Sequence, residues 1–146
     1  EKTSIGEFTS NENIEIATIL HKTAMKNDYV VPRLALNASV LFASGQASLN
    51  PGTAAEFDRI ARFIETFSPS KILLVGHTDS DGDADSNLRL SEDRAEAVKR
   101  YLTESYDFIN SEMIIARGHG EVYPIAPNNS PENKTLNRRI EVVIWE

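Results

Sequence analysis

The clearest pattern in the chain begins at residues 33–42, where apolar side chains recur at every second position with polar ones between them. A period of two is typical of a β-strand that buries one of its faces. The segment 139–145 alternates in the same way, and shorter apolar runs at 71–75 and 113–116 are typical of strands inside a sheet. The pattern therefore predicts about four strands.

Helical spacing fills the intervals between these strands. After Asn50-Pro51, apolar residues fall on one helical face until Ser68-Pro69 ends the segment. A second helix is expected to begin at a capping Ser91. Ser130-Pro131 indicates a short third helix, whereas the Gly-His-Gly of residues 118–120 indicates a turn. The apolar stripes of the two long helices are Phe57, Ile60, Ala61, Ile64 and Phe67 in the first and Ala95, Val98 and Leu102 in the second.

The predicted order of elements is β-α-β-α-β-(α)-β. Strands that alternate with helices favour an α/β (α+β) two-layer sandwich, in which both long helices pack on one face of a mixed sheet of about four strands. We interpret residues 31–146 as one domain. Residues 1–30 are interpreted as an N-terminal extension or linker with a short helical candidate at 14–25.

Composition restricts the possible partners. The 146 residues include 22 acidic and 15 basic side chains, and the resulting net charge of -7 disfavours nucleic acid. The absence of cysteine excludes disulfides and thiolate metal sites. No apolar run approaches the roughly 18 to 20 residues of a membrane span, so we expect contact with a membrane only through segments upstream of this sequence.

The candidate chemistry lies at the end of the strand at residues 71–75. Asp79 ends a Gly-His-Thr-Asp stretch there, and we expect Arg94 in the first turn of the helix that follows. A guanidinium beside a helix N-terminus is a good carboxylate receptor, and an aspartate is an ammonium receptor. Together they suit a zwitterion, the free end of an amino acid. The alternative is an internal salt bridge between Asp79 and Arg94.

Four ordered motifs resemble the OmpA-like peptidoglycan-binding domains, over residues 40 to 143. In that family, the aspartate after His-Thr and the arginine of the Leu-Ser-x-x-Arg-Ala motif hold the ammonium and carboxylate of meso-diaminopimelate. The resemblance gives these roles to Asp79 and Arg94, and it implies supporting roles around the same pocket for Thr78, Asn87, Leu90, Ser91 and Arg138. The motifs are Gly76-His77-Thr78-Asp79, Asn87-x-x-Leu90-Ser91-x-x-Arg94-Ala95, Gly118-x-Gly120-Glu121-x-x-Pro124-Ile125 and Asn137-Arg138-Arg139.

The chain departs from the family pattern at two places. Ala43 follows Phe42, where many members have an aspartate that approaches the ligand. The string at residues 41–47 is more similar to that of flagellar-motor stator B subunits, which implies binding with one contact fewer. Asn133-Lys134 replaces the usual Gly-Arg of the last loop, so the shape of that loop is expected to differ.

Other polar residues suggest metal binding or catalysis, and for each of them a structural role is the alternative. His77 and His119 each lie beside glycine with no third ligand at zinc-like spacing, which favours structural hydrogen bonding over catalysis or metal binding. The acidic loop matches an EF-hand-like calcium register, but Ser86 stands where glycine is needed, so a solvated loop is favoured. That register comprises Asp81, Asp83, Asp85, Asn87 and Glu92.

The sequence therefore favours a non-enzymatic domain without a cofactor. By the resemblance, it binds diaminopimelate-type peptidoglycan in the periplasm of a Gram-negative bacterium and anchors an outer-membrane or other envelope component to the wall. No nucleophile with its base is recognisable, which disfavours hydrolysis. The alternatives are an anchoring domain of a flagellar-type stator or secretion complex, and a module for protein interaction or homodimerisation.

Overall fold

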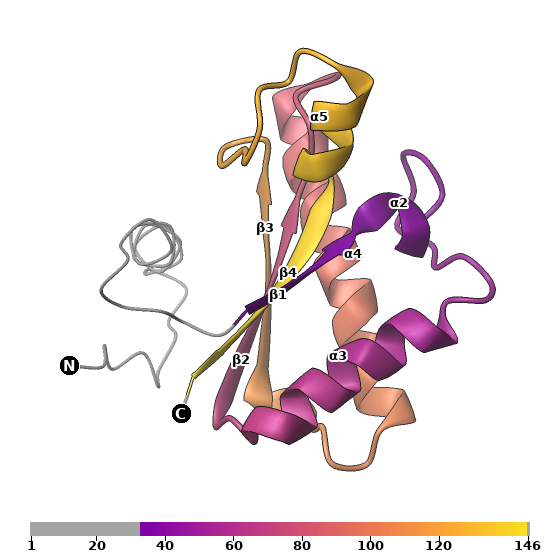
Figure 1. Ribbon diagram of the computed structural model, residues 1–146, viewed down its shortest axis with the longest axis vertical. Coiled ribbons are helices and arrows are strands. Elements are labelled where there is room, and N and C mark those ends of the chain that lie inside the picture. Colours follow the sequence, from indigo (N-terminus) through magenta and orange to yellow (C-terminus); the bar gives the residue numbers. More distant parts are fainter. Residues whose placement is uncertain (1–32, 146) are drawn as a thin grey trace.

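The computed structural model describes residues 33–145, which form a sheet with two long helices packed on one side (Figure 1). The sheet has the strand order β1-β4-β2-β3. Strand β4 pairs antiparallel with both of its neighbours, whereas β2 and β3 pair in parallel. The prediction of a mixed four-stranded sheet is therefore confirmed. The strands are β1 (Arg33–Asn37), β2 (Lys71–His77), β3 (Ile114–Gly120) and β4 (Arg139–Trp145).

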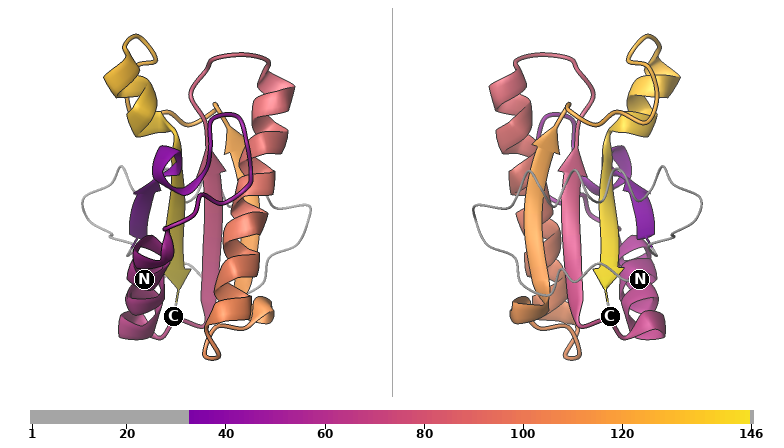
Figure 2. Two further views of the ribbon diagram at one scale, coloured as in Figure 1. Left: turned by 90° about the vertical axis from the view of Figure 1, so that its right-hand side faces the viewer. Right: turned by 90° about the vertical axis from the view of Figure 1, so that its left-hand side faces the viewer.

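Helices α3 (Ala54–Phe67) and α4 (Ala84–Ser105) cover the same face of the sheet (Figure 2). Their predicted apolar stripes are buried against the strands, except that Phe67 at the end of α3 is exposed. Helix α3 ends as expected, with Ser68 in the left-handed conformation. The shorter elements are α2 (Ala38–Leu41), the 3-10 helix η2 (Ser111–Met113) and α5 (Pro131–Asn137).

The first strand is shorter than the alternation predicted. It ends at Asn37, whose side chain accepts a hydrogen bond from the backbone N–H of Ser39 and thereby caps helix α2. The turn of helix breaks the period of two, so Val40 is 46% exposed instead of buried. This cap matters for the site, because α2 packs against β1 and β4 and places Ser39 on the wall of the cavity described below.

The start of the second long helix was also predicted wrongly. Helix α4 begins at Ala84, where the carboxylate of Asp83 accepts hydrogen bonds from the backbone N–H and the hydroxyl of Ser86. Ser91 therefore lies two turns inside the helix and is not its cap. The same holds for Arg94, which is not at a helix N-terminus.

Residues 118–120 belong to strand β3 and not to a turn. Their glycines allow α4 to approach the sheet very closely. A Cβ on Gly118 would lie 2.2 Å from the backbone N of Glu92, and one on Gly76 would lie 2.3 Å from the carbonyl oxygen of Ser91. Ser91 fastens this contact, because its hydroxyl donates to Leu88 O and accepts from the N–H of Gly120.

The helical candidate at residues 14–25 lies outside the described residues, so it remains a prediction, as does the boundary near residue 30. Within residues 33–145, no helix has both the length and the apolar character that a membrane span needs.

Candidate ligand-binding site

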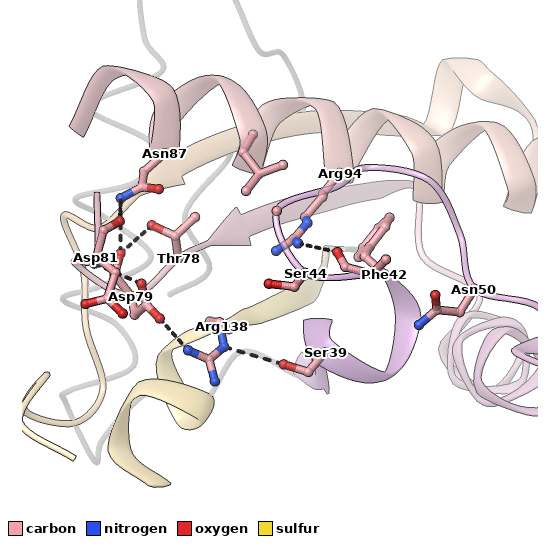
Figure 3. A pocket seen from close by; sticks show the side chains of 13 residues that line it. Ser39, Phe42, Ser44, Asn50, Thr78, Asp79, Asp81, Asn87, Arg94 and Arg138 are labelled. Carbon is pink, nitrogen blue, oxygen red and sulfur yellow. Dashed lines mark hydrogen bonds and ion pairs between the residues drawn. The ribbon is translucent and has the colours of Figure 1, made fainter. Parts of the chain in front are cut away.

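A cavity of about 590 Å³ opens where the end of β2 faces helix α4 and the α2 segment (Figure 3). Six of the seven residues predicted for the site line it, which brings together residues from Thr78 to Arg138. The lining residues are Ser39, Phe42, Ala43, Ser44, Gly45, Asn50, Thr78, Asp79, Asp81, Asn87, Leu90, Arg94 and Arg138.

Asp79 is a buried carboxylate, only 7% exposed, at the loop that follows β2. One of its oxygens accepts a hydrogen bond from the N–H of Asp81 at 2.9 Å, and the other pairs with the guanidinium of Arg138. A carboxylate has about four lone-pair positions, so these two partners leave capacity for a further cation. The side chain is thus held in place before any ligand arrives.

Arg94 is buried as well, at 5% exposure, and holds the loop after α2. Its Nε donates to Gln46 O at 2.7 Å and its Nη2 donates to Ala43 O at 3.2 Å. The guanidinium lies 5.0 Å from the ring centre of Phe42. Burial lowers the pKa of Arg94, the positive charge of Arg138 lowers it further, and Asp79 opposes the shift.

The predicted alternative of an Asp79–Arg94 salt bridge is wrong, because Asp79 pairs with Arg138 while Arg94 bonds to backbone carbonyls. Two of the five N–H donors of Arg94 are used in this way. Among the described residues, no hydrogen bond from its Nη1 is found, so the outer edge of the fork can still receive a carboxylate.

Arg138 connects three parts of the site. Besides Asp79, it donates to the hydroxyl of Thr135 at 2.8 Å on helix α5 and to that of Ser39 at 3.4 Å on α2. Lys134 adds a second ion pair, at 3.1 Å, to Asp81. Helix α5 is therefore fastened to the loop after β2 by two charge pairs.

The supporting residues fix the shape of this loop. Asn87 donates from its amide to Asp81 O at 2.9 Å and to the carboxylate of Glu121 at 3.0 Å, and the hydroxyl of Thr78 donates to Asp79 O. Leu90 supplies an apolar patch on the cavity wall. Ser91 is the exception among the predicted site residues, because it bonds to Gly120 between the helix and the sheet and does not line the cavity.

Several lining residues were not predicted as site residues. Ser39 lies in α2, which the alternation had placed inside a strand. Asn50 was predicted to open the first long helix but precedes α3, which begins at Ala54, and Ser44 lies beside Ala43. The family departure at Ala43 still bears on the site, since the carbonyl of Ala43 accepts from Arg94. Small polar residues around a one-turn helix follow no recognisable sequence pattern. Only the fold shows that they line the cavity.

The calcium register is not arranged as a binding loop. Residues 84–92 are helical, so the positions from Asp85 to Glu92 run along α4 instead of wrapping around one point. Asp83 serves as the helix cap and Asp81 pairs with Lys134. In the described part of the chain, no group of three or more histidine, aspartate or glutamate side chains is placed to hold a metal ion.

The two histidines lie on the opposite face of the sheet from α3 and α4, with their rings 5.7 Å apart. His77 is buried, and His119 also stacks edge-on against Tyr123 at 5.6 Å. Burial lowers the pKa of His119 to about 4. Neither histidine lines the cavity.

Comparison with known proteins agrees with this architecture. Residues 41–138 match the OmpA family. The chain is 34% identical over 112 residues to outer membrane protein A of Bordetella avium, which covers 77% of this chain and 57% of that protein. It is 32% identical over 105 residues to peptidoglycan-binding protein ArfA of Mycobacterium bovis, covering 72% of this chain and 32% of the relative.

The fold also matches the cell wall anchor of the T6SS from Pseudomonas aeruginosa, with a TM-score of 0.69, 25% identity, and coverage of 88% of this chain and 95% of that one. The chain spans less than two thirds of the length of the curated relatives named above. The family match covers most of the residues that the structure describes and contains the whole cavity apart from Ser39. The chain belongs to the OmpA family.

Proposed function

We propose that this domain binds peptidoglycan by holding the free amino-acid end of meso-diaminopimelate in the stem peptide. The observation that carries the proposal is that two buried opposite charges, Asp79 and Arg94, line one cavity without being paired to each other. The ligand's ammonium binds the carboxylate of Asp79, and its carboxylate binds the open edge of the Arg94 fork.

The burial of Asp79 and Arg94 explains how such a site can bind a charged ligand with useful affinity. A charge pair at an exposed surface contributes little, whereas Asp79 and Arg94 are already desolvated and held by hydrogen bonds before the ligand enters. Arg138 adds positive charge beside the carboxylate position. The pocket therefore favours a zwitterion over a simple cation, and this favours diaminopimelate over lysine, which lacks the second carboxylate.

The names of similar proteins support the wall as the partner. A peptidoglycan-binding protein and a cell wall anchor are among the relatives and structures that match over most of this chain. By this proposal the domain makes and breaks no bond, resides in the periplasm of a Gram-negative bacterium, and connects an envelope component to the wall. Affinity of one site is modest, and many copies along the wall provide firm anchoring.

Calorimetric titration with a soluble muropeptide tests the proposal. The wild type is expected to bind the diaminopimelate form and to bind the lysine form at least about tenfold more weakly. Asp79→Asn and Arg94→Lys should each reduce affinity for the diaminopimelate form by a similar factor. Arg89→Ala is the matched control, because Arg89 is exposed on the same helix and bonds to Ser86. Equal binding of both muropeptides by the wild type would contradict the pocket assignment.

A second candidate concerns the assembly that the domain serves. The likeness to the T6SS wall anchor covers nearly all of that chain, which favours an anchoring role in a secretion or motor complex. The string at residues 41–47, similar to stator B subunits, points the same way. Sequencing the gene upstream decides it, since a stator requires a transmembrane helix and a lipoprotein requires a lipidated cysteine. Homodimerisation is tested separately, by measuring the mass in solution over a dilution series.

A further inference from the structure

The two central strands are apolar on both faces, although the described helices cover only one. In β2, Ile72 and Leu74 belong to the core beneath α3 and α4, whereas Leu73 and Val75 do not and point the other way. In β4, Val142 and Ile144 belong to the core, whereas Val143 points to the other face. Strands that read as continuous apolar runs are typical of sheets covered on both sides. The second face is therefore built to be covered.

Strand pairing defines this second surface, which we call the outer face. Val143, Leu73 and Ile115 lie side by side in one row, and Val75 follows in the next. Charged residues surround this apolar centre, with Glu141 pairing to Arg33 at 3.1 Å and to Arg139 at 2.6 Å. The right-hand view of Figure 2 looks onto the outer face, with α3 and α4 behind the sheet.

Leu73, Val75 and Val143 form the apolar centre of the outer face. The described loop at residues 121–130 reaches one end of the face, where Tyr123 O accepts from Arg139. Exposing such an apolar surface to water would cost roughly 25 cal/mol per Å². Some further part of the chain or a partner has to cover it.

The chain upstream of β1 has the length and the pattern to do so. Arg33, the first residue of β1, already lies on the outer face, opposite Val143. Residues 26–32 can span about 23 Å at about 3.3 Å per residue. The four strands are only about 14 Å across at about 4.8 Å per gap. A helix at residues 14–25 would place Ile16, Ile19 and Leu20 on one face, with Thr18 on the opposite side.

We propose that the outer face docks the amphipathic segment at residues 14–25 of the same chain. Docking within one chain proceeds at a high effective concentration, which favours it over capture of a separate protein. Glu15 of the segment and Glu12 just before it are acidic and complement Arg33 and Arg117 at the rim of the face. The segment thus forms a third layer over the sheet, on the side away from α3 and α4.

Because this sequence contains no cysteine, the reactivity of a single introduced cysteine shows whether the outer face is covered. Val75→Cys and Leu74→Cys place a thiol on opposite faces of one strand, and Phe67→Cys gives the rate of an exposed thiol. Reaction with a maleimide should be at least about tenfold slower at Val75→Cys than at Phe67→Cys. Adding Leu20→Asp should accelerate labelling at Val75→Cys by about tenfold, whereas Thr18→Asp should leave it unchanged.

Labelling of Val75→Cys at the exposed rate would show an open face and overturn the proposal. So would an unchanged rate after Leu20→Asp, or a rate that rises on dilution, since the latter identifies a second copy as the cover. If Leu20→Asp accelerates Leu74→Cys equally, it opens the whole domain and the docking is rejected. Disulfide formation between Leu20→Cys and Ile115→Cys, but not between Leu20→Cys and Phe67→Cys, would support docking independently.

Discussion

The carboxylate of Asp79 pairs with the guanidinium of Arg138, which the sequence places 59 residues away and which begins the turn into the last strand. Arg94, the partner of Asp79 in the alternative salt-bridge interpretation, instead holds the backbone of residues 43–46. One charge of the site is thus used to position α5, and another to position the loop after α2. The proposed ligand receptor and the tertiary cross-links therefore share the same side chains.

The Asp79–Arg138 pair is expected to stabilise the domain measurably. Arg138→Ala leaves a carboxylate of 9% side-chain exposure without its cation, so we expect a loss of about 1–2 kcal/mol in the free energy of unfolding. Lys134→Ala serves as control, because its partner Asp81 is 64% exposed and the loss should stay below about 0.5 kcal/mol. Urea titration measures both, and equal losses would show that the first pair is no stronger than a surface bridge.

The close approach of α4 to the sheet predicts a large penalty for a single methyl group. In Gly118→Ala the new Cβ meets the backbone N of Glu92 at 2.2 Å, and a helix backbone cannot move aside cheaply. We expect a loss of about 3 kcal/mol in stability.

Gly52→Ala is the matched control for this substitution. Gly52 has a φ of +79° but nothing within 4 Å of its Cβ position, so it tests backbone strain alone, at about 1 kcal/mol. Thermal unfolding would separate the two variants. A similar loss in both would mean that the helix can shift away from β3.

Periodicity and motifs predicted most of the helices and strands. The two boundaries that were predicted wrongly, the end of β1 and the start of α4, have local causes. The alternation located β1 and β4, but the capping side chain of Asn37 converted the second half of the first segment into helix α2. The polar string before Ser91 hid two turns of α4, because Asp85, Ser86 and Asn87 are weak helix formers and only the cap at Asp83 marks the true start.

The grouping of these residues around one cavity was predictable, because the resemblance supplied four motifs in order. Their pairing was not, since the partner of Asp79 depends on where α5 packs, and no local pattern encodes that distance. Ser91 shows the limit most clearly. It belongs to the motif of the site, yet it acts between α4 and β3, where it accepts a hydrogen bond from the N–H of Gly120.

Asn137 is expected to be essential for the loop that precedes α5. Its side chain is fully buried and its oxygen accepts from the N–H groups of Ile125 and Ala126. Its amide also donates to the carbonyl of Ala126 and to the side chain of Asn128. Asn137→Ala removes all four bonds and leaves buried polar groups unsatisfied, which should cost about 3 kcal/mol.

The matched control is Asn133→Ala, because the Asn133 side chain donates to Asn129 in an exposed hydrogen bond. Its loss is expected to stay below about 0.5 kcal/mol. Chemical denaturation followed by the intrinsic fluorescence of Trp145 compares the two variants. If Asn137→Ala is as stable as the wild type, the loop is held by other contacts.

The lowered pKa of His119 predicts how the free energy of unfolding depends on pH. Burial lowers its pKa to about 4, and Arg117 and Arg139 lower it further while Glu141 opposes them. The unfolded chain therefore takes up a proton near pH 6.5, whereas the folded chain does so only near pH 4. Between these values the unfolded state binds more protons, so stability rises with pH and is complete above about 6.5. The contribution is up to about 3 kcal/mol, lost as the pH falls towards 4.

His119→Gln removes this titration while keeping a polar side chain at the same place. We expect the difference in free energy of unfolding between the wild type and the variant to change by about 1–2 kcal/mol from pH 7 to pH 5. Carboxylates that titrate in this range affect both proteins alike, so the difference isolates the histidine. A difference that stays constant with pH would mean that His119 protonates equally in the folded and unfolded chains, and that the outer face around it admits water.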